Sequence, residues 1–147
     1  MSYAGDLTPQ DAWAKLEEGA ILVDVRTEGE WAHIGIPDPA ARLATAHRPL
    51  FIQWTFPGGI PNPDFITELN EELNEELKLQ APEDTGVELV FLCRSGQRSI
   101  AAAIAATQAG HTSYNVLEGF EGEPDRYGER TVNGWKNRGL PISLGRN

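Results

Sequence analysis

One segment restricts the fold of this chain most. In it, an apolar run is followed by a short polar loop and then by an alanine-rich stretch. Residues 87–92, Val-Glu-Leu-Val-Phe-Leu, have the length and composition of a buried strand. They lead into the loop Cys93-Arg-Ser-Gly-Gln-Arg-Ser99, which is followed by Ile100-Ala-Ala-Ala-Ile-Ala-Ala106. This order predicts a strand, a tight loop and a helix over residues 99–109, which Gly110 closes.

The rest of the chain alternates between strand-like and helix-like segments. Thr8 and Pro9 are typical of the first positions of a helix, and Gly19 of its end. Asp64 is expected to cap a second long helix that reaches Leu77. Strands are expected near residues 3–7, 20–25, 51–54 and 113–117, with a helical turn over 28–33, a surface connection over 35–50 and an irregular loop over 56–63. Such alternation predicts an α/β fold: a parallel sheet of about five strands, flanked by helices on both faces.

Cys93 is the only cysteine of the chain and follows directly on a predicted strand. In parallel sheets, sites form beyond the carboxyl ends of the strands. The loops that begin at Arg26, Thr55, Cys93 and Glu118 are therefore expected to line one site. Backbone N–H groups of a tight loop, the start of a helix and nearby arginines all favour a thiolate, so Cys93 is the candidate nucleophile. A buried core cysteine is the alternative, which the following Arg-Ser-Gly-x-Arg-Ser disfavours.

Three segments resemble the rhodanese family of sulfurtransferases. The cysteine loop resembles the active-site loop of its single-domain members, and residues 22–34 resemble the N-terminal signature of the family, although Gly35-Ile36-Pro37 departs from its usual ending. Residues 116–120 and 134–141 resemble the C-terminal signature, interrupted by a charged insertion near 120–133. The resemblance covers roughly residues 6 to 142 and implies one rhodanese-like domain over residues 1–147.

The resemblance implies a sulfurtransferase that carries sulfane sulfur as a persulfide on Cys93. The donor would be thiosulfate or a related anion, and the acceptor a thiol or cyanide, with a protein acceptor possible and no cofactor required. Two alternatives remain open. One is a persulfide-carrying or protein-binding module without turnover; the other is a cysteine-dependent phosphatase or arsenate reductase. Phosphatases place five residues between cysteine and arginine, whereas four separate Cys93 from Arg98. The shorter loop favours sulfur over phosphate.

The resemblance also assigns roles to the residues of the loop. Cys93 is the expected catalytic residue, in a pocket walled by residues 55–62, Arg94 and 119–124. The expected substrate-binding residues are Arg94, Ser95, Gly96, Gln97 and Arg98, and the supporting residues are Asp24, Arg26 and Ser99.

Several of these residues have structural alternatives. Either arginine of the loop could pair with a carboxylate, and Arg98 could brace the loop from behind. Arg26 is expected to pair with Glu30, Asp24 to accept a hydrogen bond from the loop, and Ser99 to cap the following helix.

The composition of the chain limits the kinds of partner that it is expected to bind. Twelve basic and 22 acidic residues give a net charge of −10, which argues against nucleic acid and anionic membranes. A single cysteine excludes an internal disulfide framework. The three histidines lack the spacing of a metal site. No signal-peptide pattern or membrane-spanning apolar run occurs, so a cytoplasmic protein is expected.

Overall fold

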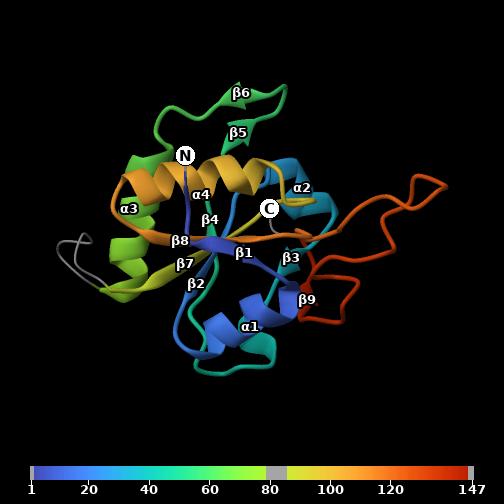
Figure 1. The fold of residues 1–147 in the computed structure, drawn as a ribbon, viewed down its shortest axis with the longest axis horizontal. Helices are drawn as coiled ribbons and strands as arrows, with labels where there is room; N and C mark the ends of the chain where they lie inside the picture. The colour runs from blue at the N-terminus through green and yellow to red at the C-terminus, as the bar shows by residue number, and fades with distance from the viewer. Residues whose placement is uncertain (1, 79–85, 146–147) are drawn as a thin grey trace.

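The computed structural model describes residues 2–78 and 86–145, and its centre is a five-stranded sheet in the order β1-β8-β7-β2-β4 (Figure 1). The strands are β1 (Gly5–Leu7), β2 (Ile21–Asp24), β4 (Leu50–Phe51), β7 (Glu88–Leu92) and β8 (Thr112–Val116). All four neighbouring pairs are parallel. The predicted parallel α/β sheet is thereby confirmed, including its short N-terminal strand.

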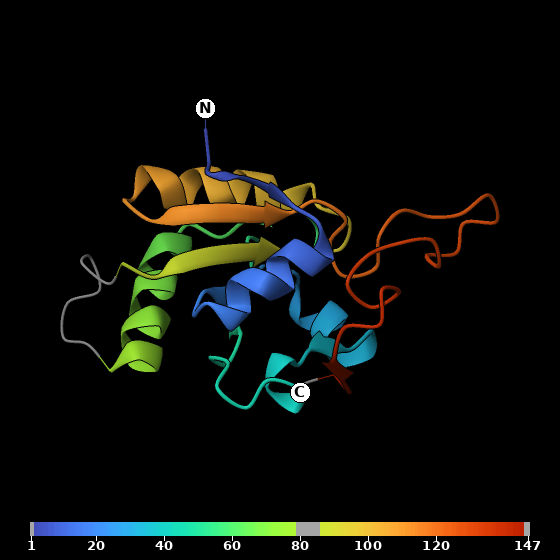
Figure 2. The same ribbon diagram turned by 60° about the horizontal axis from the view of Figure 1, so that its bottom comes forward.

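Helices cover both faces of this sheet (Figure 2). Alternate residues along a strand point to opposite faces. Ile21, Val23, Leu89 and Phe91 pack with α3 (Phe65–Leu77) and α4 (Arg98–Gln108) in one core. Leu22, Val90, Leu92 and Val116 pack with α1 (Pro9–Glu17), Phe120 and Trp135 in the other. Strands that are buried on both faces explain why residues 20–25 and 87–92 are almost continuously apolar.

The helix starts agree only in part with the sequence prediction. Thr8 caps α1 by accepting a hydrogen bond from the N–H of Asp11, as predicted. Asp64 stands at the cap position of α3, but its side chain makes no capping bond. Helix α4 begins at Arg98 with Gln97 at the cap position, so the predicted capping role of Ser99 is wrong. The short helix α2 (Glu28–His33) begins with a capping box of Thr27 and Glu30.

The loop predicted to be irregular over residues 56–63 instead contains a small hairpin. Strands β5 (Thr55–Phe56) and β6 (Ile60–Pro61) pair antiparallel. Gly58 and Gly59 both have positive φ, at 88° and 78°, which lets the chain reverse between the strands. The predicted strand over 51–54 is also shifted and shortened, to Leu50–Phe51.

Three further short elements lie within segments predicted to be connections or left unassigned. Strand β3 (Ile36–Pro37) pairs antiparallel with β9 (Ile142–Ser143), and the 3₁₀ helix η1 (Pro39–Ala41) follows β3. This pairing joins residues over 100 positions apart, so no local pattern could predict it.

The charged insertion extends away from the sheet after β8 and returns to its base (Figure 1). At that base, the N–H groups of Trp135 and Lys136 donate to the carbonyls of Gly119 and Phe120. The two halves of the interrupted C-terminal signature therefore lie together. At the tip, the Asp125 carboxylate accepts hydrogen bonds from Tyr127, Glu129 and Thr131. No helix in the described residues is long and apolar enough to cross a membrane.

Candidate active site

The cysteine loop, residues 93–98, leaves the carboxyl end of β7 and rests on the chain that follows β8. The Cys93 carbonyl accepts a hydrogen bond from Phe120, and the Arg94 carbonyl accepts one from Glu121. Gly96 has a φ of +95°, and a methyl group there would collide with the carbonyl oxygen of Leu117. The loop can approach this segment so closely only because residue 96 has no side chain.

The Cys93 side chain is buried, with 1% of the residue exposed. The N–H of Gly96 donates a hydrogen bond to its Sγ atom at 3.1 Å, and Ser99 Oγ also lies 3.1 Å from Sγ. One of the predicted loop N–H groups, that of Gly96, thus points at the sulfur. The start of α4, at Arg98, adds the positive end of a helix dipole close by.

Behind the sulfur lies a polar chain that the sequence analysis missed. Ser99 Oγ is 2.5 Å from Asn115 Oδ1, and Asn115 Nδ2 donates to Asp6 Oδ1 at 3.0 Å. Ser99 and Asn115 are fully buried, while Asp6 lies on the edge strand β1 and also accepts from the Tyr3 hydroxyl. The available signal was Asn115 itself, a polar residue inside the strand 113–117.

Arg94 points out of the loop and pairs with Glu121. Its Nε donates to Glu121 Oε2 at 2.9 Å; the Arg94 side chain is 46% exposed, whereas that of Glu121 is 7% exposed. Both residues line a pocket of about 400 Å³, together with Pro57 of the hairpin and Thr27, Gly29, Glu30, His33 and Ile34. The predicted walls are present in part, but Cys93 does not line this pocket.

Arg98, at the end of the loop, is held by α2. Its guanidinium forms a bidentate pair with Glu30, at 2.7 and 2.9 Å. Burial alone would raise the pKa of Glu30, but the bonds from Arg98 and from the Thr27 N–H outweigh it and lower this pKa. The same pair raises the pKa of Arg98. Arg98 therefore occupies the bracing position that the sequence offered as an alternative to substrate contact.

Arg26 is fully buried and pairs with Asp24, so the predicted pair of Arg26 with Glu30 is wrong. Its Nε and Nη2 contact the Asp24 carboxylate at 3.0 and 2.7 Å, and Nη2 also donates to the Gly35 carbonyl. The guanidinium lies over the Phe120 ring, 4.2 Å from its centroid. Asp24 accepts from Arg26 rather than from the cysteine loop. Arg26 in turn connects the end of β2 to Phe120, which follows β8.

Comparison with known proteins identifies the family. The family described as rhodanese-like domain matches residues 8–122. The chain belongs to this family. The crystal structure of Rv0390 from M. tuberculosis aligns with a TM-score of 0.82 and 42% identity, over 98% of this chain and 100% of that one. A rhodanese-like domain protein from Staphylococcus aureus aligns with a TM-score of 0.55 and 20% identity, over 95% and 98% of the two chains, and shows the shared fold.

A curated relative comes from Rickettsia rickettsii. The uncharacterized protein RP600 homolog is 34% identical over 125 residues, which is 84% of this chain and 83% of that protein. The rhodanese-like family includes sulfurtransferases, so membership confirms the fold and the broad class that the sequence motifs indicated.

The remaining predicted residues of this rhodanese-like domain differ in exposure. Ser95 is partly buried, Gln97 is exposed and Gly96 is buried against the chain after β8. Thr55 and Glu118 lie outside the pocket beside the loop, and Glu118 pairs instead with Arg138 at 2.7 Å. The strand ends thus converge. Of the residues that begin the loops, however, Arg26 and Glu118 form ion pairs with Asp24 and Arg138 and do not line the pocket.

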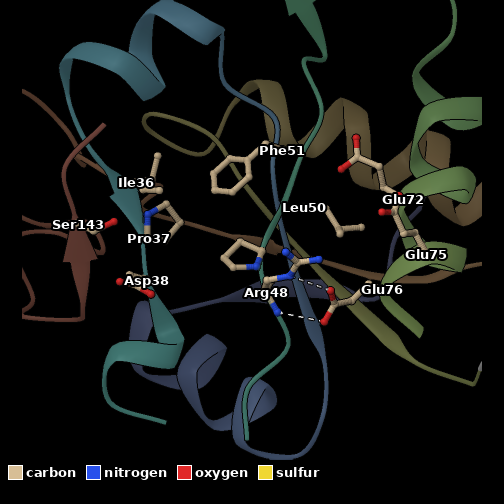
Figure 3. Close-up of a pocket in the computed structure, with 11 residues that line it drawn as sticks. Ile36, Pro37, Asp38, Arg48, Leu50, Phe51, Glu72, Glu75, Glu76 and Ser143 are labelled. Atoms are coloured by element: carbon tan, nitrogen blue, oxygen red, sulfur yellow. Dashed lines mark hydrogen bonds and ion pairs between the residues drawn. The ribbon is translucent and has the colours of Figure 1, made fainter. Parts of the chain in front are cut away.

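A second pocket, of about 360 Å³, lies between β4, β3 and α3 and contains no residue of the cysteine loop (Figure 3). Its acidic side is formed by Glu72, Glu75 and Glu76, and Arg48 pairs with Glu76.

Within residues 2–78 and 86–145, no group of three or more His, Cys, Asp or Glu side chains could hold a metal ion. His111 contacts Asn70, and burial lowers its pKa.

Proposed function

We propose that this protein is a sulfurtransferase that moves a sulfane sulfur from thiosulfate or a related anion to a thiophilic acceptor through a Cys93 persulfide. The observation that carries the proposal is the sulfur of Cys93 at the end of a parallel strand, with the Gly96 N–H directed at it. This donor can stabilise negative charge on sulfur, as backbone donors do in an oxyanion hole. Membership of a family that includes sulfurtransferases supports the same chemistry.

The reaction is a double displacement. The Cys93 thiolate attacks the outer sulfur of thiosulfate, a new S–S bond forms, and the S–S bond of thiosulfate breaks as sulfite leaves with the electron pair. Cyanide or a thiolate then attacks the outer sulfur of the persulfide. The persulfide bond breaks, thiocyanate or a new persulfide departs, and the Cys93 thiolate is restored.

Arg94 is the proposed docking group for the anionic donor. Its guanidinium reaches the pocket beside the loop, and guanidinium groups match the oxygens of sulfite and thiosulfate. Ser95, Gly96 and Gln97 complete the proposed binding loop, while Arg98 braces it through its pair with Glu30. A single domain in the cytoplasm is the proposed setting, where a thiolate persists.

The test is to incubate the protein with thiosulfate and then measure its intact mass. One added sulfur is expected; Cys93→Ser should not gain it, and cyanide should remove it with release of thiocyanate. Thiocyanate production over many cycles establishes turnover. Aryl phosphate hydrolysis or arsenate reduction that depends on Cys93, without sulfur loading, would overturn the proposal.

A persulfide carrier without turnover is the second candidate. The burial of Cys93 and the Arg94–Glu121 pair at the pocket favour it, because both limit the approach of an acceptor. The same assay separates the two: a carrier takes up one sulfur from the donor but shows poor multiple turnover in thiocyanate production.

A further inference from the structure

The polar chain behind Cys93 restricts where the hydrogen of the Ser99 hydroxyl can point. Asn115 Nδ2 lies 3.0 Å from Asp6 Oδ1 and 3.3 Å from the Gly96 carbonyl oxygen. Both of these atoms are hydrogen-bond acceptors. The amide of Asn115 must therefore direct its NH₂ group toward them, which leaves Oδ1 facing Ser99.

Ser99 has two acceptors within reach and one hydrogen. Asn115 Oδ1 is 2.5 Å from Ser99 Oγ, and Cys93 Sγ is 3.1 Å from it. An amide oxygen only accepts, and a serine hydroxyl donates one hydrogen. If the hydrogen turned to the sulfur, the buried Asn115 oxygen would lose this partner, which is costly inside a protein. The hydrogen therefore points to Asn115, and Ser99 Oγ presents a lone pair to Cys93.

We propose that Asp6 and Asn115 are positioning residues that keep the Ser99 hydrogen away from Cys93, so that Ser99 accepts from the Cys93 thiol and does not stabilise its thiolate. The Gly96 N–H is then the hydrogen-bond donor that faces Sγ, while Ser99 faces it as an acceptor. This inference goes beyond sulfur transfer, because it concerns the ionisation of Cys93 whatever its reaction partner.

Charged groups lie on the elements around the cysteine loop, and the test must leave them intact. They are Asp6 on β1, Asp24 and Arg26 at the end of β2, Glu30 on α2, Arg94 in the loop, Arg98 at the start of α4 and Glu121 after β8. Only Asp6 belongs to the polar chain, so substitution of Asn115 or Ser99 changes no charge.

The experiment follows thiolate formation through its ultraviolet absorbance as pH is varied, with the spectrum of Cys93→Ser subtracted. The chain has one cysteine, so the difference reports on Cys93 alone. Asn115→Leu frees the Ser99 hydrogen for the sulfur and should shift the midpoint by about one pH unit to lower pH, the value of one hydrogen bond to a charged group. In the double variant Ser99→Ala/Asn115→Leu the shift should disappear, because no hydroxyl remains to donate.

One further variant, Ser99→Ala, keeps the test decisive if Asn115→Leu does not fold. Ser99→Ala should not raise the midpoint. If Ser99 instead donated to the thiolate, its removal would raise the midpoint by about one unit. Ser113→Ala is the matched control. It removes a buried hydroxyl from β8, the strand that also carries Asn115, and this hydroxyl bonds to the His111 carbonyl. A higher midpoint in Ser99→Ala, or an unchanged one in Asn115→Leu, would overturn the proposal.

Discussion

At the scale of single residues, the buried pair of Asp24 and Arg26 is the charge contact on which stability depends most. Both side chains are fully buried. Asp24→Asn leaves the guanidinium without its counter-charge, so the free energy of unfolding should fall by about 3–5 kcal/mol. Urea denaturation measures this loss. Glu88→Gln, which breaks the partly exposed pair with Lys15, is the control and should cost much less, because solvent screens this pair.

Glu121 neutralises the positive charge of the proposed docking group, Arg94. Glu121→Gln keeps an oxygen that can accept from Arg94 Nε but removes the negative charge that neutralises the guanidinium. The KM for thiosulfate, a dianion, should therefore fall several-fold, while Arg94→Ala should raise it. Steady-state thiocyanate production gives both values. Glu123→Gln, at an exposed position two residues further on, controls for a general change of surface charge. An increased KM in Glu121→Gln would show that its charge assists the donor.

At the scale of elements, the cysteine loop depends on a close approach to the chain after β8. Gly96→Ala introduces a methyl group against the Leu117 backbone, in addition to strain at a φ of +95°. Gly110 has a similar φ of +100° but open space around it. Gly110→Ala should therefore cost only about 1 kcal/mol and keep sulfur loading. Gly96→Ala should be destabilised further and lose most loading, measured by intact mass after thiosulfate. Equal effects of the two substitutions would show that strain, not the close approach, decides.

Local patterns predicted most of the elements, because strand, loop and helix are encoded by neighbouring residues. The run 87–92, the cysteine loop and α4 appear within one or two residues of their predicted bounds. The charged contacts were harder to predict, since Arg26 had both Asp24 and Glu30 as nearby carboxylates. Only the folded chain brings Glu30 to Arg98 and leaves Asp24 for Arg26. Asn115 and Asp6 likewise meet only through the pairing of β1 with β8.

At the scale of the whole molecule, the site is assembled by segments that are distant in the sequence. The helix α2, the cysteine loop and the segment after β8 contribute Glu30, Arg94 and Glu121 to one pocket. Carboxylates thus offset both arginines of a loop that is proposed to bind an anion. The net charge of −10 means that the protein as a whole repels an anion. Electrostatic attraction of the donor therefore depends on a few local guanidinium contacts rather than on the field of the whole protein.

The Glu30–Arg98 pair joins α2 to α4 and should make the stability of the whole fold depend on pH. The pKa of Glu30 is lowered in the folded state, so its contribution is fully present above the unfolded value of about 4.3. That contribution is lost as pH falls through the lower, folded pKa. Glu30→Gln should therefore be less stable than the natural protein by about 1–2 kcal/mol near neutral pH, between the values for exposed and buried pairs.

Urea denaturation from about pH 7 to about pH 3 follows this difference, which should shrink at the acidic end because protonation removes the same charge from the natural protein. Glu118→Gln is the matched control. Its bond from Arg138 also lowers the pKa of Glu118, but the Arg138 side chain is 40% exposed, so solvent screens the pair. Its loss should have the same sign and a smaller size. A difference for Glu30→Gln that stays constant across this range would mean that the glutamate acts through packing and not through its charge.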